Sequence, residues 1–341
     1  MAVIRGTREK SVRLVSTRPD MASRLWHMNA DFEAELAAPA GAYRRPPHSE
    51  DLNRRLSEHL LWLARPGDAL LVKGPWPERL RAEAGRRGVE LMAPEGPPRA
   101  GGLIFTPWGW TPSAAAAGER AGAAVRPVAF ETVARVNSKL WSHALEVEMG
   151  AALPGAALAS TAEELREAVA RACPGPDDKW VVKSPQGFAA RGRVLGRGPS
   201  LGEPQARWAE RRMALGETLI FQPWLDVVRE YGIVMEVASG GSVEVHGVSD
   251  YQTNGAGVGR GYILGRPPAP HRLAELERVA HFVGARLHAE GFWGPVGVDA
   301  VEHAGGLHPL LEVNARHTMG FVALAVERSL RPSGPVFWSI K

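Results

Sequence analysis

The sequence GVDAVEHAGGLHPLLEVNARH, residues 297–317, has the pattern of a β-hairpin whose strands carry carboxylate and amide side chains. A two-residue turn at Gly305–Gly306 places Asp299 directly opposite Glu312. Asn314 shares the face of Glu312, because side chains alternate along a strand. Two facing carboxylates repel without a cation between them, and oxygen ligands without His or Cys suit Mg²⁺ or Mn²⁺. The pattern predicts a divalent-cation site; the alternative is a strand slipped by one residue, with these side chains solvated.

A lysine ends the strand-like run WVVK at residues 180–183. The chain contains only six lysines, so lysine is not its default surface cation. The next segment, SPQGFAARGRV, is no Walker motif, but its glycine N–H groups can approach a phosphate closely. We predict a phosphate site, against the alternative of a surface lysine beside an ordinary loop. The residues concerned are Lys183, Gly187, Gly192, Arg191 and Arg193.

Length and composition indicate a folded protein with two domains or three small subdomains. The 341 residues are 45% apolar and 23% charged, and no run approaches the roughly 18 apolar residues of a membrane span. The N-terminus lacks the pattern of a secretory signal. The single Cys173 excludes an internal disulfide and a metal site built on thiolates. We therefore expect a cytoplasmic protein without a membrane partner.

The basic balance does not predict nucleic-acid binding. The sequence pI is about 9.4, but the net charge is only +4 and the arginine pairs are scattered, mostly beside acids. Solvated helix faces explain such pairs better than a nucleic-acid footprint.

The first part of the chain predicts a small α/β domain. Strand patterns at residues 12–16 and 68–74 and an apolar run at 102–110 alternate with helical patterns at 50–64 and 77–88. Such alternation is typical of a parallel sheet. Trp108 and Trp110 are expected to pack on this domain rather than to line a pocket.

After an Ala/Gly-rich junction at residues 113–124, the pattern changes. A helical region at 130–150 has Lys139 in its middle, and Ser160 or Thr161 can cap a following helix with Glu163 or Glu164 three residues on. From residue 180 strands dominate, with Gly240–Gly241 indicating a hairpin. Helices are predicted at 203–214 and 271–289.

The order of six short motifs carries a resemblance. VNSKLW (136–141), WVVKSPQGFAARGRV (180–194), IFQPWL (220–225), REYGI (229–233), GVDAV (297–301) and LLEVNAR (310–316) follow one another. Over residues 125–330 this order resembles the ATP-grasp superfamily. The resemblance implies an α/β and α+β protein with a pre-ATP-grasp domain at 1–115, a central lid subdomain at 116–225 and a C-terminal subdomain with the metal site at 226–341.

The resemblance also implies roles for matching positions. Lys139 and Lys183 resemble the lysines that hold nucleotide phosphates, and Arg316 resembles an arginine beside the transferred phosphate. Asp299, Glu312 and Asn314 resemble the ligands of Mg²⁺, two ions being expected, with Mn²⁺ as the alternative. The lid and the hinge that reads adenine and ribose correspond to Gln186, Gly187, Arg191, Gly192, Gln222, Pro223, Trp224, Leu225 and Asp226.

Two positions depart from the superfamily pattern. Gln222 stands where Glu is frequent, and Ala189–Ala190 stand in the lid where Gly or Ser is more usual. The adenine and ribose assignments are accordingly less secure than the metal assignment.

The implied reaction is phosphoryl transfer from ATP to a carboxylate, followed by attack of an amine on the acylphosphate. The catalytic residues would be Arg316 and Lys183. Two alternatives stay open: another acceptor, such as a thiol or bicarbonate, and a module that binds ATP without catalysis. A nicotinamide-dependent oxidoreductase is not supported, because GAGVGRG at residues 255–261 lacks the dinucleotide fingerprint.

Substrate contacts are predicted on the strand and loop at residues 243–262. Their polar mixture suits an amino acid or a peptide, and the general style resembles the peptide ligases of natural-product pathways. Arg229 matches a position that often faces substrate, and a homodimer is one expectation, since dimers are common in the superfamily. The candidate substrate residues are Arg229, His246, Asp250, Gln252, Asn254, Arg260 and Arg316.

Overall fold

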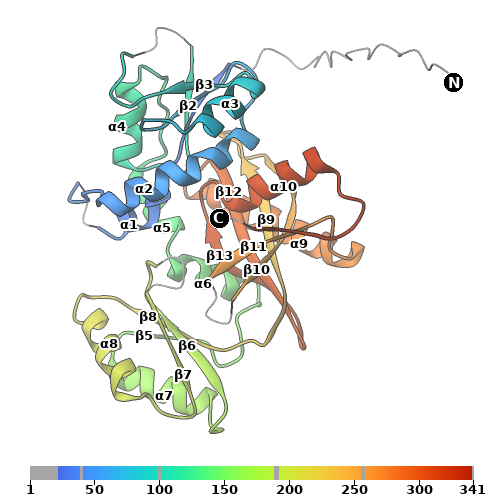
Figure 1. Ribbon diagram of the computed structural model, residues 1–341. Coiled ribbons are helices and arrows are strands. Elements are labelled where there is room, and N and C mark those ends of the chain that lie inside the picture. The colour runs from blue at the N-terminus through green and yellow to red at the C-terminus, as the bar shows by residue number, and fades with distance from the viewer. Residues whose placement is uncertain (1–21, 39–40, 99–101, 188–191, 255–257, 340–341) are drawn as a thin grey trace, which may run out of the picture.

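The computed structural model describes residues 22–38, 41–98, 102–187, 192–254 and 258–339 (Figure 1). The predicted strand at 12–16 and the predicted ligand Arg191 lie outside these ranges. Within them, no helix has the length and apolar character needed to cross a membrane.

The N-terminal region contains a parallel sheet, as predicted. Strands β1 (Arg24–His27), β2 (Ala69–Leu71), β3 (Glu90–Met92) and β4 (Ile104–Pro107) pair in the order β3-β2-β1-β4. The helical elements are α1 (Phe32–Leu36), α2 (Pro47–Leu56), the 3₁₀ helix η1 (Ser57–Trp62), α3 (Glu78–Arg87) and α4 (Pro112–Arg120). The predicted helix at 50–64 thus tightens into η1 after Leu56. Strand β1 was not predicted, because four residues are too few for a clear alternation.

A second sheet forms the lower subdomain of Figure 1. Its antiparallel strands β5 (Ala157–Ala159), β6 (Lys179–Lys183), β7 (Arg193–Arg197) and β8 (Leu219–Pro223) pair in the order β5-β8-β6-β7. Helices α7 (Ala162–Ala172) and α8 (Glu203–Met213) pack against it. The cap of α7 is Thr161 with Glu164, which confirms the predicted capping box.

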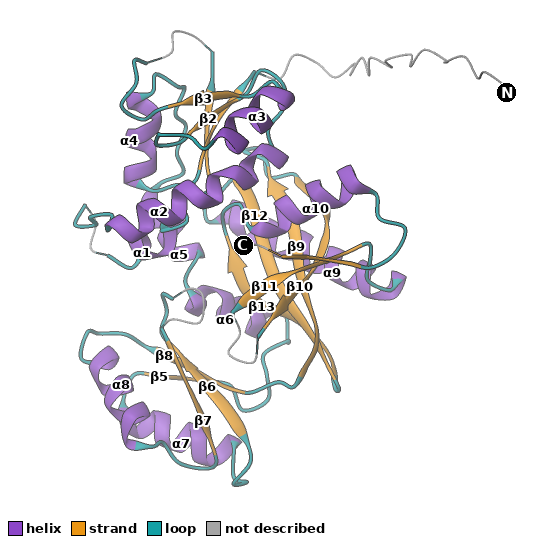
Figure 2. Cartoon of the chain, in the orientation of Figure 1, coloured by secondary structure: helices purple, strands orange, loops and turns teal. Residues whose placement is uncertain are grey.

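The third sheet is antiparallel and has the order β13-β12-β9-β10-β11-β14 (Figure 2). Its strands are β9 (Val227–Val237), β10 (Val243–Thr253), β11 (Gly259–Leu264), β12 (Gly294–His303), β13 (Gly306–Asn314) and β14 (Val336–Ser339). Helix α9 (Pro270–Ala289) packs on the face of Ile233 and Met235. Helix α10 (Met319–Leu330) lies on the other face, where Gly320 approaches Val234. The β9–β10 hairpin confirms the prediction at Gly240–Gly241.

The helical region at 130–150 is two helices, α5 (Phe130–Val136) and α6 (Lys139–Glu148). The prediction of one region with Lys139 in its middle is therefore wrong. Ser138 caps α6 by accepting a hydrogen bond from the Leu140 N–H, a role for which serine is well suited. As a result Lys139 is the first residue of α6.

The hairpin of β12 and β13 pairs Asp299 with Glu312, as predicted, although its turn lies elsewhere. The chain turns at residues 304–305, because His303 pairs with Gly306, so the predicted Gly305–Gly306 turn is wrong. A bulge offsets this difference: Ala300 alone lies between the paired positions on β12, whereas residues 309–311 lie between them on β13. Pro309 lacks an N–H and suits such a bulge.

Gly196 is essential to the packing of the second sheet. It pairs with Trp180 across β6 and β7, and a Cβ at this position would lie 1.9 Å from the Trp180 ring. We expect Gly196→Ala to lower the free energy of unfolding by about 1–3 kcal/mol, because Trp180 is buried and must move. Urea denaturation measures the change. Gly240→Ala is the matched control, since its Cβ meets no atom within 4 Å; equal effects of the two substitutions would show that Trp180 repacks freely.

Candidate active site

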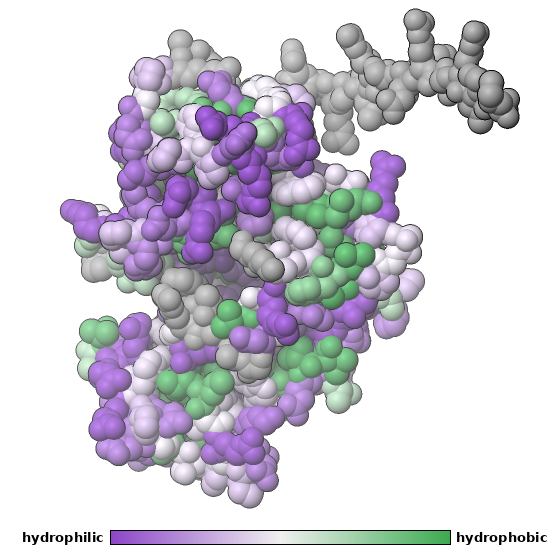
Figure 3. All heavy atoms as spheres, viewed as in Figure 1, coloured by the Kyte–Doolittle hydropathy of each residue, from purple (hydrophilic) through white to green (hydrophobic). Residues whose placement is uncertain are grey.

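A cavity of about 840 Å³ lies where the second sheet, the third sheet and helix α1 meet. On the surface, an indentation at the left of Figure 3 sets the lower subdomain apart from the rest. The predicted residues that line the cavity are Lys139, Lys183, Gly187, Gln222, Pro223, Trp224, Leu225, Asp226, Arg229, Asp250, Gln252, Asn254, Asp299, Glu312, Asn314 and Arg316. Arg193 lines it too, whereas Gln186, Gly192, His246 and Arg260 do not.

The predicted metal ligands lie together at the edge of the third sheet. Asn314 Nδ2 donates to Asp299 Oδ2 at 3.1 Å, and Asp299 pairs with Glu312 across the strands. Burial, and then the charge of Glu312, raise the pKa of Asp299 to about 7. The described residues contain no cluster of three His, Cys, Asp or Glu side chains arranged to hold a metal.

The residues nevertheless fit a hard divalent cation. Two carboxylates that face each other repel and favour a positive charge between them. The Lys139 ammonium already lies 2.5 Å from Glu312 Oε1. In the present arrangement the Oδ1 of Asn314 accepts from Arg316 at 3.0 Å, so Asn314 would have to reorient before its oxygen could reach a metal. The role of all three residues as ligands stays a prediction.

The two predicted phosphate lysines both point into the cavity. Lys139 Nζ donates to Gly187 O at 2.7 Å in addition to its contact with Glu312. Lys183 Nζ donates to Gln222 Oε1 at 2.6 Å. Burial lowers the pKa of Lys183 to about 8, although the charges of Glu312 and Glu146 act against this. Lys183 therefore still carries its proton at neutral pH.

The predicted lid is described at its two ends only. Gln186 turns away from the cavity and donates from Nε2 to Ala134 O at 3.2 Å. Gly192 has a φ of 72°, a conformation that favours glycine, and its carbonyl accepts from the Ser184 N–H at 2.8 Å. This hydrogen bond connects the residue after β6 with the residue before β7.

The predicted hinge runs from Gln222 to Asp226 along one wall of the cavity. The Trp224 N–H donates to Lys179 O at 2.9 Å. Asp226 is exposed and lies 3.3 Å from Lys179 Nζ. Arg193 stands over the Trp224 ring, 5.9 Å from its centre. The hinge therefore presents its backbone and the Trp224 indole along this wall, whereas the Gln222 amide contacts Lys183 and Glu146.

Arg316 forms an ion pair with Glu33 of helix α1, and only 15% of each side chain is exposed. Its guanidinium also donates to Asn314 Oδ1 and to His317 O, each at 3.0 Å. Glu33 lines the cavity and was missed by the sequence analysis. No local pattern marks it, because its partner lies in the last third of the chain.

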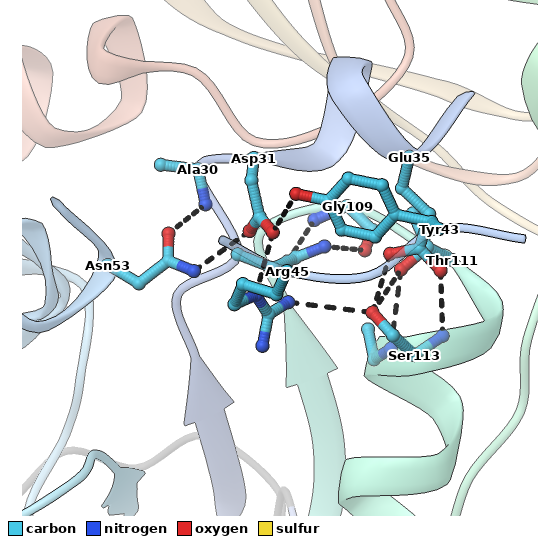
Figure 4. A network of polar contacts seen from close by, with 11 residues as sticks. Ala30, Asp31, Glu35, Tyr43, Arg45, Asn53, Gly109, Thr111 and Ser113 are labelled. Atoms are coloured by element: carbon cyan, nitrogen blue, oxygen red, sulfur yellow. Dashed lines mark hydrogen bonds and ion pairs between the residues drawn. The ribbon is translucent and has the colours of Figure 1, made fainter. Parts of the chain in front are cut away.

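A polar network fixes α1, and with it Glu33 (Figure 4). Asp31 accepts from Tyr43 Oη at 2.7 Å, Arg45 Nε at 2.6 Å and Asn53 Nδ2 at 2.8 Å. Burial would raise the pKa of Asp31, but these hydrogen bonds lower it. Glu35 accepts from the N–H and the hydroxyl of Ser113. The start of α1 is therefore held rigidly over the cavity.

The predicted substrate residue Arg229 shares a carboxylate with an arginine that was not predicted. Arg229 Nε and Arg266 Nε donate to Asp250 Oδ2 at 2.8 Å and 2.6 Å. Asp250 is 4% exposed, and all three residues line the cavity. Two guanidiniums thus share one carboxylate, and a second carboxylate, Glu230, lies at the same end of the cavity.

The sequence analysis also missed the cavity residues Glu230 and Tyr251, and it predicted His246, which does not reach the cavity. Glu230 accepts from the N–H and hydroxyl of Thr253. Tyr251 is beside it on β10, and burial raises its pKa. His246, in contrast, lies near Glu236 and Glu244 and does not line the cavity. Asp250, Gln252 and Asn254 were predicted because they are polar, whereas Tyr251 is a residue type typical of strands.

No sequence-family model matches the chain. No curated protein matches it either.

Solved structures match its fold over most of its length. The biotin carboxylase domain of Hydrogenobacter thermophilus 2-oxoglutarate carboxylase, a dimer in complex with MgADP, ADP and bicarbonate, has a TM-score of 0.54 and 12% identity over 92% of this chain and 71% of its own. Staphylococcus aureus N5-carboxyaminoimidazole synthetase has a TM-score of 0.51 and 10% identity over 92% of this chain and 80% of its own. Rhizobium etli pyruvate carboxylase has a TM-score of 0.52 and 14% identity over 89% of this chain and 27% of its own.

These structures belong to ATP-grasp enzymes, so the resemblance inferred from the motif order is confirmed at the level of the fold. The predicted fold class, an α/β domain followed by a two-part ATP-grasp region, is confirmed with it. This chain has the ATP-grasp fold.

Proposed function

We propose that this chain is an ATP-dependent ligase that joins a carboxylate to an amine and releases ADP and phosphate. The observation that carries the proposal is the cavity itself. It brings three cationic side chains to one place with a pair of facing carboxylates: Lys139, Lys183, Arg316, Asp299 and Glu312. A module that only binds a nucleotide does not need this whole set.

The cationic residues would hold ATP and neutralise the charge that moves during phosphoryl transfer. Lys139 and Lys183 project into the cavity from α6 and β6, on the side of the hinge. Arg316 would exchange its contact with Glu33 for the transferred phosphoryl group. Asp299, Glu312 and Asn314 would hold Mg²⁺, which supplies charge neutralisation at the phosphates when it is bound.

In the first step a carboxylate oxygen of the substrate attacks the γ-phosphorus, and the bond from this phosphorus to ADP breaks. In the second step the amine attacks the acyl carbon, phosphate leaves, and the amine loses a proton. Because water would hydrolyse the acylphosphate, its exclusion from the cavity matters. The lid that the resemblance implies falls mostly on residues 188–191, which lie outside the described ranges.

An amino acid or a peptide is the proposed substrate. The guanidiniums of Arg229 and Arg266 line this wall and can donate hydrogen bonds to an anionic group such as a carboxylate. Asn254 and Gln252 add neutral polar groups to the same wall. The predicted contact Arg260 is left out of the proposal, because its side chain is exposed and does not line the cavity.

The test is a measurement of ADP release with amino acids and short peptides supplied alone and in pairs. We expect ADP release with Mg²⁺ only when a carboxylate and an amine are both present, with an amide product by mass spectrometry. Release with a thiol or bicarbonate in place of the amine would favour the other acceptor chemistries. ATP binding without turnover under every condition would favour the non-catalytic module and overturn the proposal.

A further inference from the structure

A buried carboxylate lies behind the hinge, outside the cavity. Glu146 on α6 is 1% exposed, and its neighbours His143, His308 and Gln222 are 6%, 2% and 3% exposed. Its Oε2 contacts His143 Nδ1 at 3.1 Å, and its Oε1 lies 3.6 Å from His308 Nε2. Its third neighbour, Gln222 Nε2, lies 3.2 Å from Oε2 and 3.4 Å from Oε1. None of the reaction steps above uses this carboxylate.

The amide of Gln222 links Glu146 to Lys183. A carboxylate only accepts hydrogen bonds and an ammonium only donates them. The Gln222 amide must therefore turn its NH₂ to Glu146 and its oxygen to Lys183, which is the orientation found, with Lys183 Nζ 2.6 Å from Oε1. The reversed amide would place its oxygen against the Glu146 carboxylate and its NH₂ against the Lys183 ammonium.

Glu146 and Lys183 each help to compensate the buried charge of the other, although Glu312 acts more strongly on Lys183. A buried carboxylate and a buried ammonium each lose hydration that only a partner can replace. Burial would raise the pKa of Glu146, but the hydrogen bond with His143, the nearby His308 and then the charge of Lys183 lower it. In return the charge of Glu146 supports the proton on Lys183. Glu146 thus affects a cavity residue that it does not touch.

We propose that Glu146 is a positioning residue for nucleotide binding, which holds the Gln222 amide in one orientation and thereby aims the Lys183 ammonium into the cavity. The proposal rests on the proposed function, because its measurement is the affinity for ATP. We call Glu146, Gln222 and Lys183 the relay. Glu146 accepts a hydrogen bond from the Gln222 NH₂, the Gln222 oxygen accepts one from Lys183, and the Lys183 ammonium would face the phosphates.

The experiment compares two single substitutions with their combination in the full chain. Glu146→Gln removes the charge, and Gln222→Glu alone places two carboxylates side by side. We expect each to raise the Kd for MgATP at least about tenfold, the effect of one hydrogen bond to a charged group. The double substitution moves the carboxylate from position 146 to position 222 and leaves the net charge of the chain unchanged. We expect its Kd to return to within about threefold of the original, which is strong non-additivity.

Glu148→Gln is the matched control, because Glu148 lies on the same helix, is partly exposed and pairs with Arg286. We expect its Kd to be unchanged. If Glu146→Gln does not fold, Gln222→Met tests the same relay by removing the amide alone, and we expect the same loss of affinity. A merely structural Glu146 would give additive losses without rescue, or no change in Kd, and either result would overturn the proposal. Failure of the unsubstituted chain to bind ATP would instead count against the proposed function.

Discussion

Replacing Glu312 by glutamine is expected to abolish ATP turnover while leaving the fold intact. Glu312 contacts Lys139, pairs with Asp299 and faces the cavity with 29% of its side chain exposed. Its charge is needed to hold a divalent cation and to keep Lys139 in place, so we expect a loss in kcat of about 10²–10³-fold or more. Steady-state ADP release at saturating Mg²⁺ measures the effect.

The control for this substitution is Glu244→Gln, since Glu244 lies on β10 with 79% of its side chain exposed. Both variants are expected to keep the thermal midpoint of the original chain within a few degrees, because neither carboxylate supports the core. Glu312→Asp should need a higher Mg²⁺ concentration for half-maximal activity. Retained ADP formation by Glu312→Gln would contradict the metal assignment decisively.

Replacing Arg316 by lysine is expected to lower kcat by about 10²–10³-fold with a much smaller change in the KM for ATP. Lysine keeps the positive charge, but it lacks the planar fork that binds two phosphate oxygens at once. A contact formed mainly in the transition state affects kcat rather than ground-state binding. Single-turnover measurements separate the chemical step from product release.

Arg278→Lys provides the comparison, because Arg278 lies exposed on α9, outside the cavity, and donates to Ala274 O of the same helix. We expect its kinetics to match those of the unsubstituted chain. If Arg316→Lys retained full kcat but lost thermal stability, Arg316 would serve to anchor Glu33 and helix α1, and its assignment to phosphoryl transfer would fail.

The pairing of Asp299 with Glu312 was predicted from the sequence by a partly incorrect argument. The alternation of side chains correctly placed both carboxylates on one face. The turn, however, lies one residue earlier than predicted, and the bulge at residues 309–311 restores the pairing. Alternation is a local property that a sequence displays directly. A bulge is selected by the neighbouring strand and by the helices packed on the sheet, which the local pattern does not contain.

Local chemistry was predicted where a few adjacent residues suffice for it. The capping box of α7, the β9–β10 hairpin and the lysine at the end of β6 each depend on residues close together in the chain. The motif order then indicated the ATP-grasp fold. The break before Lys139 was missed, because the Asn137–Ser138 pair continues the helical spacing on either side.

By itself, the sequence predicted the type of most of the longer strands and helices, the fold class, and the carboxylate, amide and lysine residues that face one cavity. Only the tertiary structure decided which distant side chains meet them. Glu33 reaches Arg316, Arg266 joins Arg229 on Asp250, and His308 lies beside Glu146. The physical reason is that secondary structure follows from short-range periodicity and capping, whereas these contacts depend on how three sheets pack together around the cavity.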